Sequence, residues 1–108
     1  MENKDLTIKE MQRISYELME KINVKKNIIH EPDSIFLSLA EEVGEVAREL
    51  SKKQKGWRGD FDKEKLGEEL ADVVSRAMMI ASDNDIDLSG AMKKKIEKYK
   101  KRFELNGI

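Results

Sequence analysis

The chain has 108 residues, the length of a single domain spanning residues 1–108, and its lack of cysteine excludes disulfide bonds, thiolate metal sites and thiol nucleophiles. Lysine and arginine (21) nearly balance aspartate and glutamate (22), so the net charge of −1 gives no reason to expect a nucleic acid partner. The first residues are polar and no apolar run reaches about 18 residues. We therefore expect a cytoplasmic protein with no signal peptide and no membrane partner.

The first predicted helix runs from about Ile8 to Ile22. Thr7 and Glu10 have the spacing of a capping box, and apolar residues follow at helical intervals. A polar joint with Pro32 comes next and contains His30, the only histidine. We interpret His30 as a solvent-facing loop residue rather than a catalytic one, and it is too isolated to form a metal site.

The second predicted helix is capped by Asp33 or Ser34 and reaches about Lys53. Its predicted core stripe consists of Phe36, Leu39, Ala40, Val43, Val46, Ala47 and Leu50. A glycine-containing loop then ends at Asp62, which can cap a third helix from about Lys63 to Ser82.

The third predicted helix has a core stripe of its own, made of Leu66, Leu70, Val73, Val74, Ala77, Ile80 and Ala81. Met78 and Met79 fall outside this stripe, so the helix is apolar on more than one face. This predicts that a second subunit covers it, in a dimer or a tetramer.

The fourth predicted helix is capped by Asp87 or Ser89 and ends near Leu105. No segment has the alternating pattern of a strand. We therefore predict an all-α fold, an antiparallel four-helix bundle that assembles as an oligomer.

Two helices carry paired acids, with two residues between the members of each pair. The pairs are Glu42 with Glu45, and Glu69 with Asp72. A helix turns about 100° per residue, so the members of a pair lie within roughly 60° of each other. If the helices pack side by side, four carboxylates can converge, and their repulsion is relieved by oxygen-seeking cations such as Mg²⁺ or Mn²⁺. The plainer alternative is that these acids are solvated surface residues.

Gly44 and Gly67 lie in the middle of the two acid-bearing helices. Glycine in a helix costs about 1 kcal/mol relative to alanine. Its presence beside the acids suggests the close approach of a neighbouring helix or a ligand, although an accident of sequence would look the same.

Lys95, Lys98 and Arg102 line one face of the fourth predicted helix. They are candidates for binding phosphate oxygens, whereas the ordinary interpretation is a solvated basic face that complements the helix dipole. Trp57, in the loop before the third helix, is a candidate for stacking on a nucleobase, and is equally well interpreted as a core anchor or subunit contact.

These motifs together resemble the MazG-like branch of the all-α nucleotide pyrophosphatase superfamily, over about residues 37–103. The family has an E-x-x-E pair followed by an E-x-x-D pair, which this chain meets with Glu42, Glu45, Glu69 and Asp72. The terminal element Lys98-Tyr99 and Arg102-Phe103 is also similar, although some relatives have an asparagine where Tyr99 aligns.

The resemblance implies a magnesium-dependent enzyme in which water attacks phosphorus and a nucleoside triphosphate becomes a monophosphate and pyrophosphate. The four acids would be the catalytic metal ligands, and the role would be removal of noncanonical or surplus nucleotides. Two alternatives stay open at this point: a dUTPase or phosphoribosyl-ATP pyrophosphohydrolase, which share the metal motifs, and a non-enzymatic helical interaction module.

Overall fold

The computed structural model describes residues 5–108, which form four helices: α1 (Ile8–Lys26), α2 (Pro32–Ser51), α3 (Lys63–Asp83) and α4 (Leu88–Arg102). The described part of the chain contains no strand, which confirms the prediction of an all-α protein. None of the described helices combines the length and apolar character needed to cross a bilayer. The prediction about a signal peptide concerns mainly residues 1–4, which lie outside the described range.

Two predicted helix starts are confirmed by their caps. The N–H of Glu10 donates to Oγ1 of Thr7 at 3.1 Å and the N–H of Thr7 donates to Oε1 of Glu10 at 2.9 Å, which completes a capping box on α1. At the start of α3, Oδ1 of Asp62 accepts hydrogen bonds from the next helical turn. Local sequence alone therefore determines these two helix starts.

Other helix ends differ from the prediction. Helix α1 continues to Lys26 and ends where Asn27 takes a left-handed conformation with φ 55°. The predicted caps of α2 were wrong, because Glu31 is the N-cap and Pro32, whose ring suits the first helical turn, starts the helix. Helix α4 is preceded by Asp87 as predicted, but it ends at Arg102, before Leu105.

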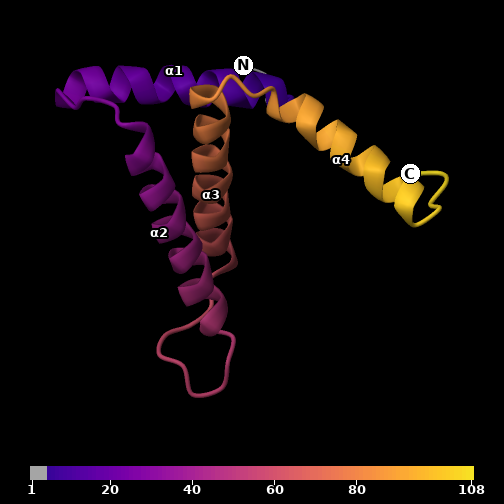
Figure 1. Cartoon of the computed structure of the whole chain (residues 1–108). Helices are drawn as coiled ribbons and strands as arrows, with labels where there is room; N and C mark the ends of the chain where they lie inside the picture. The colour runs from indigo at the N-terminus through magenta and orange to yellow at the C-terminus, as the bar shows by residue number, and fades with distance from the viewer. Residues whose placement is uncertain (1–4) are drawn as a thin grey trace.

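The helices do not form a compact four-helix bundle within one chain, contrary to the prediction. Helices α2 and α3 run antiparallel and side by side, α1 lies across one end of this pair, and α4 leads away from it (Figure 1). The turn before α4 includes Asp85 at φ 55°, a conformation that aspartate tolerates better than most residues. Only α2 and α3 are thus packed along most of their length.

The core lies where α1 crosses the α2–α3 pair. It consists of Met19, Ile35 and Met79, with Tyr16 and Ile80 packed against it. Met78 and Met79 are buried inside the chain, so the prediction that they fall outside its core was wrong.

Several residues that were predicted to face the core are exposed. The large ones are Phe36, Val43, Leu50, Leu70 and Val74, and the small residues Ala40 and Ala47 are exposed too. Phe36 is the most exposed of these, at 64%. The apolar surface that a partner could cover therefore lies on α2 as well as α3.

Two long-range polar contacts hold α1 and the joint after it. The side chain of Gln12 donates to the Ile86 carbonyl at 2.8 Å and accepts from the N–H of Leu88 at 3.1 Å. Nε2 of His30 lies 2.9 Å from Oδ2 of Asp83, at the end of α3. The interpretation of His30 as a solvent-facing loop residue was wrong, because this partly buried ring pairs with a carboxylate.

Candidate active site

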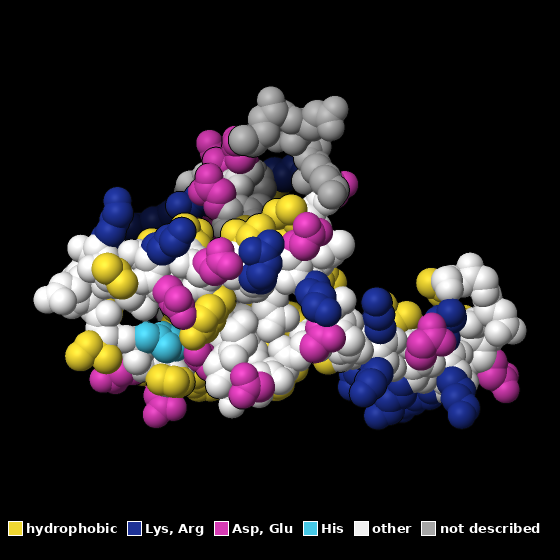
Figure 2. Space-filling view, turned by 90° about the horizontal axis from the view of Figure 1, so that it is seen from above, with side chains coloured by type: hydrophobic (Ala, Val, Ile, Leu, Met, Phe, Trp, Pro, Cys, Tyr) yellow, Lys and Arg dark blue, Asp and Glu magenta, His cyan; other side chains and the backbone are white. Residues whose placement is uncertain are grey.

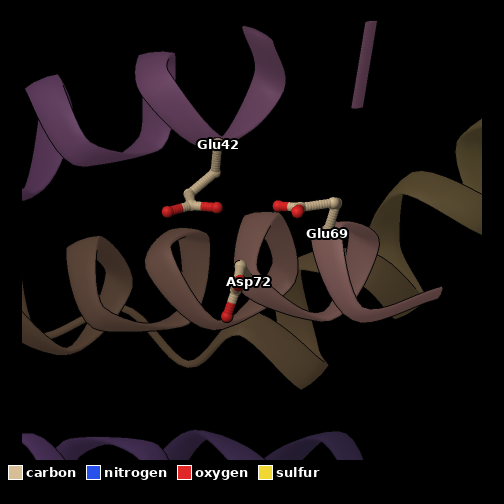
Figure 3. A group of neighbouring side chains, drawn as sticks. All are labelled: Glu42, Glu69 and Asp72. Carbon is tan, nitrogen blue, oxygen red and sulfur yellow. The ribbon is translucent and has the colours of Figure 1, made fainter. Parts of the chain in front are cut away.

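Three carboxylates meet between α2 and α3. Glu42 reaches from α2 toward α3, where Glu69 and Asp72 lie one turn apart (Figure 3). Each of the three offers an oxygen atom, and these oxygens all lie within 4.8 Å of one another. The antiparallel packing of the two helices therefore brings together acids that are 27 to 30 positions apart in the chain.

The three carboxylates are partly removed from water and repel one another. Keeping all three ionised therefore costs free energy unless a positive charge compensates. Glu69 is only 8% exposed, while Glu42 and Asp72 are partly buried. Burial raises the pKa of Glu42, the negative charges of Asp72 and Glu69 raise it further, and Arg76 acts in the opposite direction. Nζ of Lys65 lies 3.6 Å from Glu69, but this lysine is half exposed.

The donor set of this group fits a hard divalent cation. It offers oxygen atoms only, and small cations such as Mg²⁺ take carboxylate oxygens together with water or substrate phosphates. A cation among the three oxygens would offset the repulsion that raises the pKa of Glu42.

Glu45, the fourth predicted ligand, lies outside the group of three. Its side chain is 37% exposed and its Oε2 lies 4.0 Å from Nη1 of Arg48, three residues along the same helix. Such an exposed pair contributes little to stability. The side chain is thus free to take another rotamer.

The two mid-helix glycines are not explained by close packing within the chain. A Cβ atom built on Gly44 or Gly67 would meet nothing within 4 Å among the described residues. The space beside both glycines is open.

The predicted substrate-binding residues lie apart from the acids of their own chain. Lys95, Lys98 and Arg102 are on α4, which leads away from the α2–α3 pair, and Figure 2 shows its many basic side chains on this projecting arm. Trp57 is half exposed in the loop joining α2 to α3, at the end of the pair opposite to α1.

Two polar residues of the α2–α3 pair were not singled out from the sequence. Glu49 is buried at the end of α2, where it accepts a hydrogen bond from the N–H of Asp62. Arg76 lies one turn after Asp72, and its Nε donates to Oγ of Ser38 at 2.9 Å. The spacing of Asp72 and Arg76 was visible in the sequence, but the partner on α2 was not.

A protein-family model, described as the MazG nucleotide pyrophosphohydrolase domain, matches residues 30–104. The chain belongs to the MazG family. The matched range covers the end of the joint before α2 and all of α2, α3 and α4, so it includes every predicted site residue. A comparison with curated proteins gives no significant match.

Membership confirms the MazG-like resemblance and supports nucleotide pyrophosphohydrolase activity, a hydrolase reaction on a nucleotide. The α-helical fold and the group of acids are consistent with this class, whose members generally use a divalent metal ion.

Proposed function

We propose that this chain is a magnesium-dependent nucleoside triphosphate pyrophosphohydrolase that releases a nucleoside monophosphate and pyrophosphate. The observation that carries the proposal is the convergence of Glu42, Glu69 and Asp72 between two helices of a MazG domain. Solvated surface acids have no reason to converge in a partly buried position.

In this proposal Glu42, Glu69 and Asp72 hold Mg²⁺, or Mn²⁺ in its place, and Glu45 joins them by changing its rotamer. The ion would supply Lewis acidity to the phosphate oxygens and neutralise negative charge. Glu45 is close enough in sequence to follow Glu42 on the same face, and its present contact with Arg48 is weak.

The reaction adds water across one phosphoanhydride bond. The water oxygen bonds to the α-phosphorus, the bond from that phosphorus to the bridging oxygen breaks, and pyrophosphate leaves. A carboxylate oxygen of this group that does not contact the cation accepts the proton that the water loses. The acids therefore serve both in holding the substrate's counterion and in proton transfer.

The phosphate-binding cations are proposed to come from α4 of a second subunit. Lys98 and Arg102 lie on an arm that leads away from the acids of their own chain. Lys95 and Arg102 stand over the rings of Tyr99 and Phe103, at 5.5 and 5.3 Å from the centroids, so these cations and the exposed aromatic residues form one surface. A second subunit that covers these aromatic rings would therefore also contact the positively charged side chains beside them.

The size of the isolated chain supports self-association, as a dimer or tetramer. Its radius of gyration is 17.1 Å, whereas a compact domain of this length has about 13 Å. Its accessible surface is 9280 Å², against roughly 6,200 Å² for a compact monomer of its mass. Much of the excess is apolar, as at Phe36 and Phe103, and such surface is stable in water when another subunit covers it.

The test is a panel of canonical and noncanonical nucleoside triphosphates assayed for pyrophosphate release with Mg²⁺, Mn²⁺ and chelator. We expect metal-dependent release from at least one triphosphate, and its loss in Glu69→Gln. Release that is unaffected by chelator, or no release from any triphosphate or from phosphoribosyl-ATP, would contradict the proposal.

A further inference from the structure

A pocket lies beside the acid group, where α1 crosses the α2–α3 pair. Its volume is about 370 Å³, and Asp72 belongs both to its lining and to the acid group. Pockets that bind small molecules measure about 300–1,000 Å³, so this one suits a single nucleoside. If the phosphates of a substrate lie at the acid group, its nucleoside part is close enough to enter this pocket.

The residues that line this pocket combine apolar surface with a few polar groups, as a site for a nucleobase requires. Leu18, Met19, Ile22, Ile35 and Met79 provide apolar surface, while Asn23, Ser38, Ser75 and Arg76 provide polar groups. Apolar side chains suit the faces of a planar base, and a few polar groups suit its edge. A phosphate group would gain nothing from the apolar part of this lining.

Arg76 is the one basic residue in this lining, and Ser38 holds it in place. Its Nε donates to Oγ of Ser38 at 2.9 Å, and both residues are partly buried. With Nε engaged, the two terminal nitrogens of the guanidinium form a planar fork with parallel N–H donors. Such a fork pairs best with two neighbouring acceptors.

We propose that this pocket binds the nucleobase of the substrate and that Arg76 selects bases with two adjacent hydrogen-bond acceptors. Guanine presents O6 and N7, and cytosine presents O2 and N3, whereas adenine, uracil and thymine alternate donors and acceptors along their edges. This inference rests on the proposed function, which it extends to the class of base.

The experiment compares kcat/KM for dGTP, dCTP, dATP and dUTP in the wild type and in Arg76→Lys. Lysine keeps the positive charge but removes the fork. A bidentate contact discriminates by about 5- to 160-fold, so we expect the wild type to prefer dGTP or dCTP over dATP and dUTP by a factor of that size in kcat/KM. In the variant, we expect the kcat/KM values for the four triphosphates to be nearly equal. The ratio of the kcat/KM values for dGTP and dCTP shows which of the two bases the pocket prefers.

Equilibrium binding of the corresponding monophosphates, measured by calorimetry, provides a second readout that needs no turnover. The control is Arg13→Lys, an exposed arginine on α1 whose contact is Glu17 on the same helix, and it should keep the wild-type preference. Thermal melting of Arg76→Lys verifies that the fold is retained.

Two results would overturn the inference. One is a wild type that treats the four bases alike, and the other is an Arg76→Lys variant that loses activity equally on all four, as a phosphate ligand would. If no triphosphate is hydrolysed, the proposed function fails, and the monophosphates decide the inference alone: preference for dGMP or dCMP that is lost in Arg76→Lys supports it, and equal binding contradicts it.

Discussion

The backbone N–H of Asp62 donates a 2.8 Å hydrogen bond to Oε1 of Glu49, which precedes it by 13 residues. The other carboxylate oxygen of Glu49 lies 2.9 Å from Nζ of Lys52, and the residue is only 3% exposed. This contact closes the loop from α2 to α3 at its base, and therefore helps to set the register in which Glu42 faces Glu69.

We expect Glu49→Gln to lower the melting temperature at neutral pH. The Lys52 side chain, and then the N–H of Asp62, hold the pKa of Glu49 below its ordinary value of 4.5. A carboxyl whose pKa is lowered by folding contributes stability that is present above the ordinary pKa and is lost as the pH falls through the folded value. The difference between the variant and the wild type should thus shrink below about pH 4.5.

Thermal melts of both proteins between pH 3 and 7 measure this difference. Glu97→Gln is the matched control, since Glu97 is exposed and its contact with Lys100 is a surface pair. An unchanged melting temperature for Glu49→Gln at pH 7 would show that the loop closes without this carboxylate.

The features that were predicted correctly from the sequence are ones that depend on residues close together in the chain. The capping residues Thr7 and Asp62 were identified correctly because an N-cap is determined by residues within one turn. The pairing of Glu69 with Asp72 on one helix face follows from helix geometry in the same way.

The sequence alone could not predict which faces of the helices pack against one another. Val74 was assigned to the core and Met79 was not, yet the structure buries Met79 and exposes Val74, because both faces of α3 are apolar and the crossing of α1 decides between them. His30 pairs with Asp83, which lies 53 residues further along the chain, and no local sequence pattern indicates this partner. The direction of α4 likewise depends on a short turn.

Amide substitutions in the acid group are expected to weaken metal binding and activity while stabilising the metal-free protein. For Glu69→Gln and Asp72→Asn we expect a loss of at least about a hundredfold in kcat/KM. The melting temperature without metal should rise, because one of three converging charges is removed. Magnesium at 100 times its Kd should stabilise the wild type by about 2.7 kcal/mol, and these variants much less.

Glu41 and Glu68 are the controls for this series. Each precedes a proposed ligand but projects about 100° away from it. Both are exposed, and neither belongs to the group of three. If Glu68→Gln abolished pyrophosphate release while Glu69→Gln retained it, the wrong face of α3 would have been assigned to the metal.

Self-association is expected to depend on the exposed apolar side chains of α2. Light scattering of the wild type should give at least twice the chain mass of 12.5 kDa at micromolar concentration. Phe36→Glu places a charge on a surface that a partner would bury, so it should lower the mass toward that of one chain. Arg13→Glu, on the exposed side of α1, should not. A monodisperse wild-type monomer would contradict self-association.

The position of α4 predicts that two inactive variants restore each other's activity. Glu69→Gln damages the acids of a subunit, and Arg102→Glu damages the phosphate-binding arm that it gives to its neighbour. Each variant alone should lose most of its kcat/KM. When equal amounts are mixed and subunits exchange at random, half of the pairs are mixed, and each mixed pair has one site with intact acids and an intact arm. The mixture should therefore regain about one quarter of the wild-type activity.

The control for this mixing experiment joins both substitutions in one subunit and combines it with the wild type. Mixed pairs then hold one damaged acid group opposite an intact arm and one intact acid group opposite a damaged arm, so neither of their sites works. A quarter of all sites, those in pure wild-type pairs, should remain active. If the arm served the acids of its own chain, the two single variants would restore nothing, and the double variant would leave half of the sites active. An arm that serves the neighbouring subunit thus gives equal activity in the two mixtures, whereas an arm that serves its own chain gives none in the first mixture and half in the second, whatever the absolute rate of the enzyme.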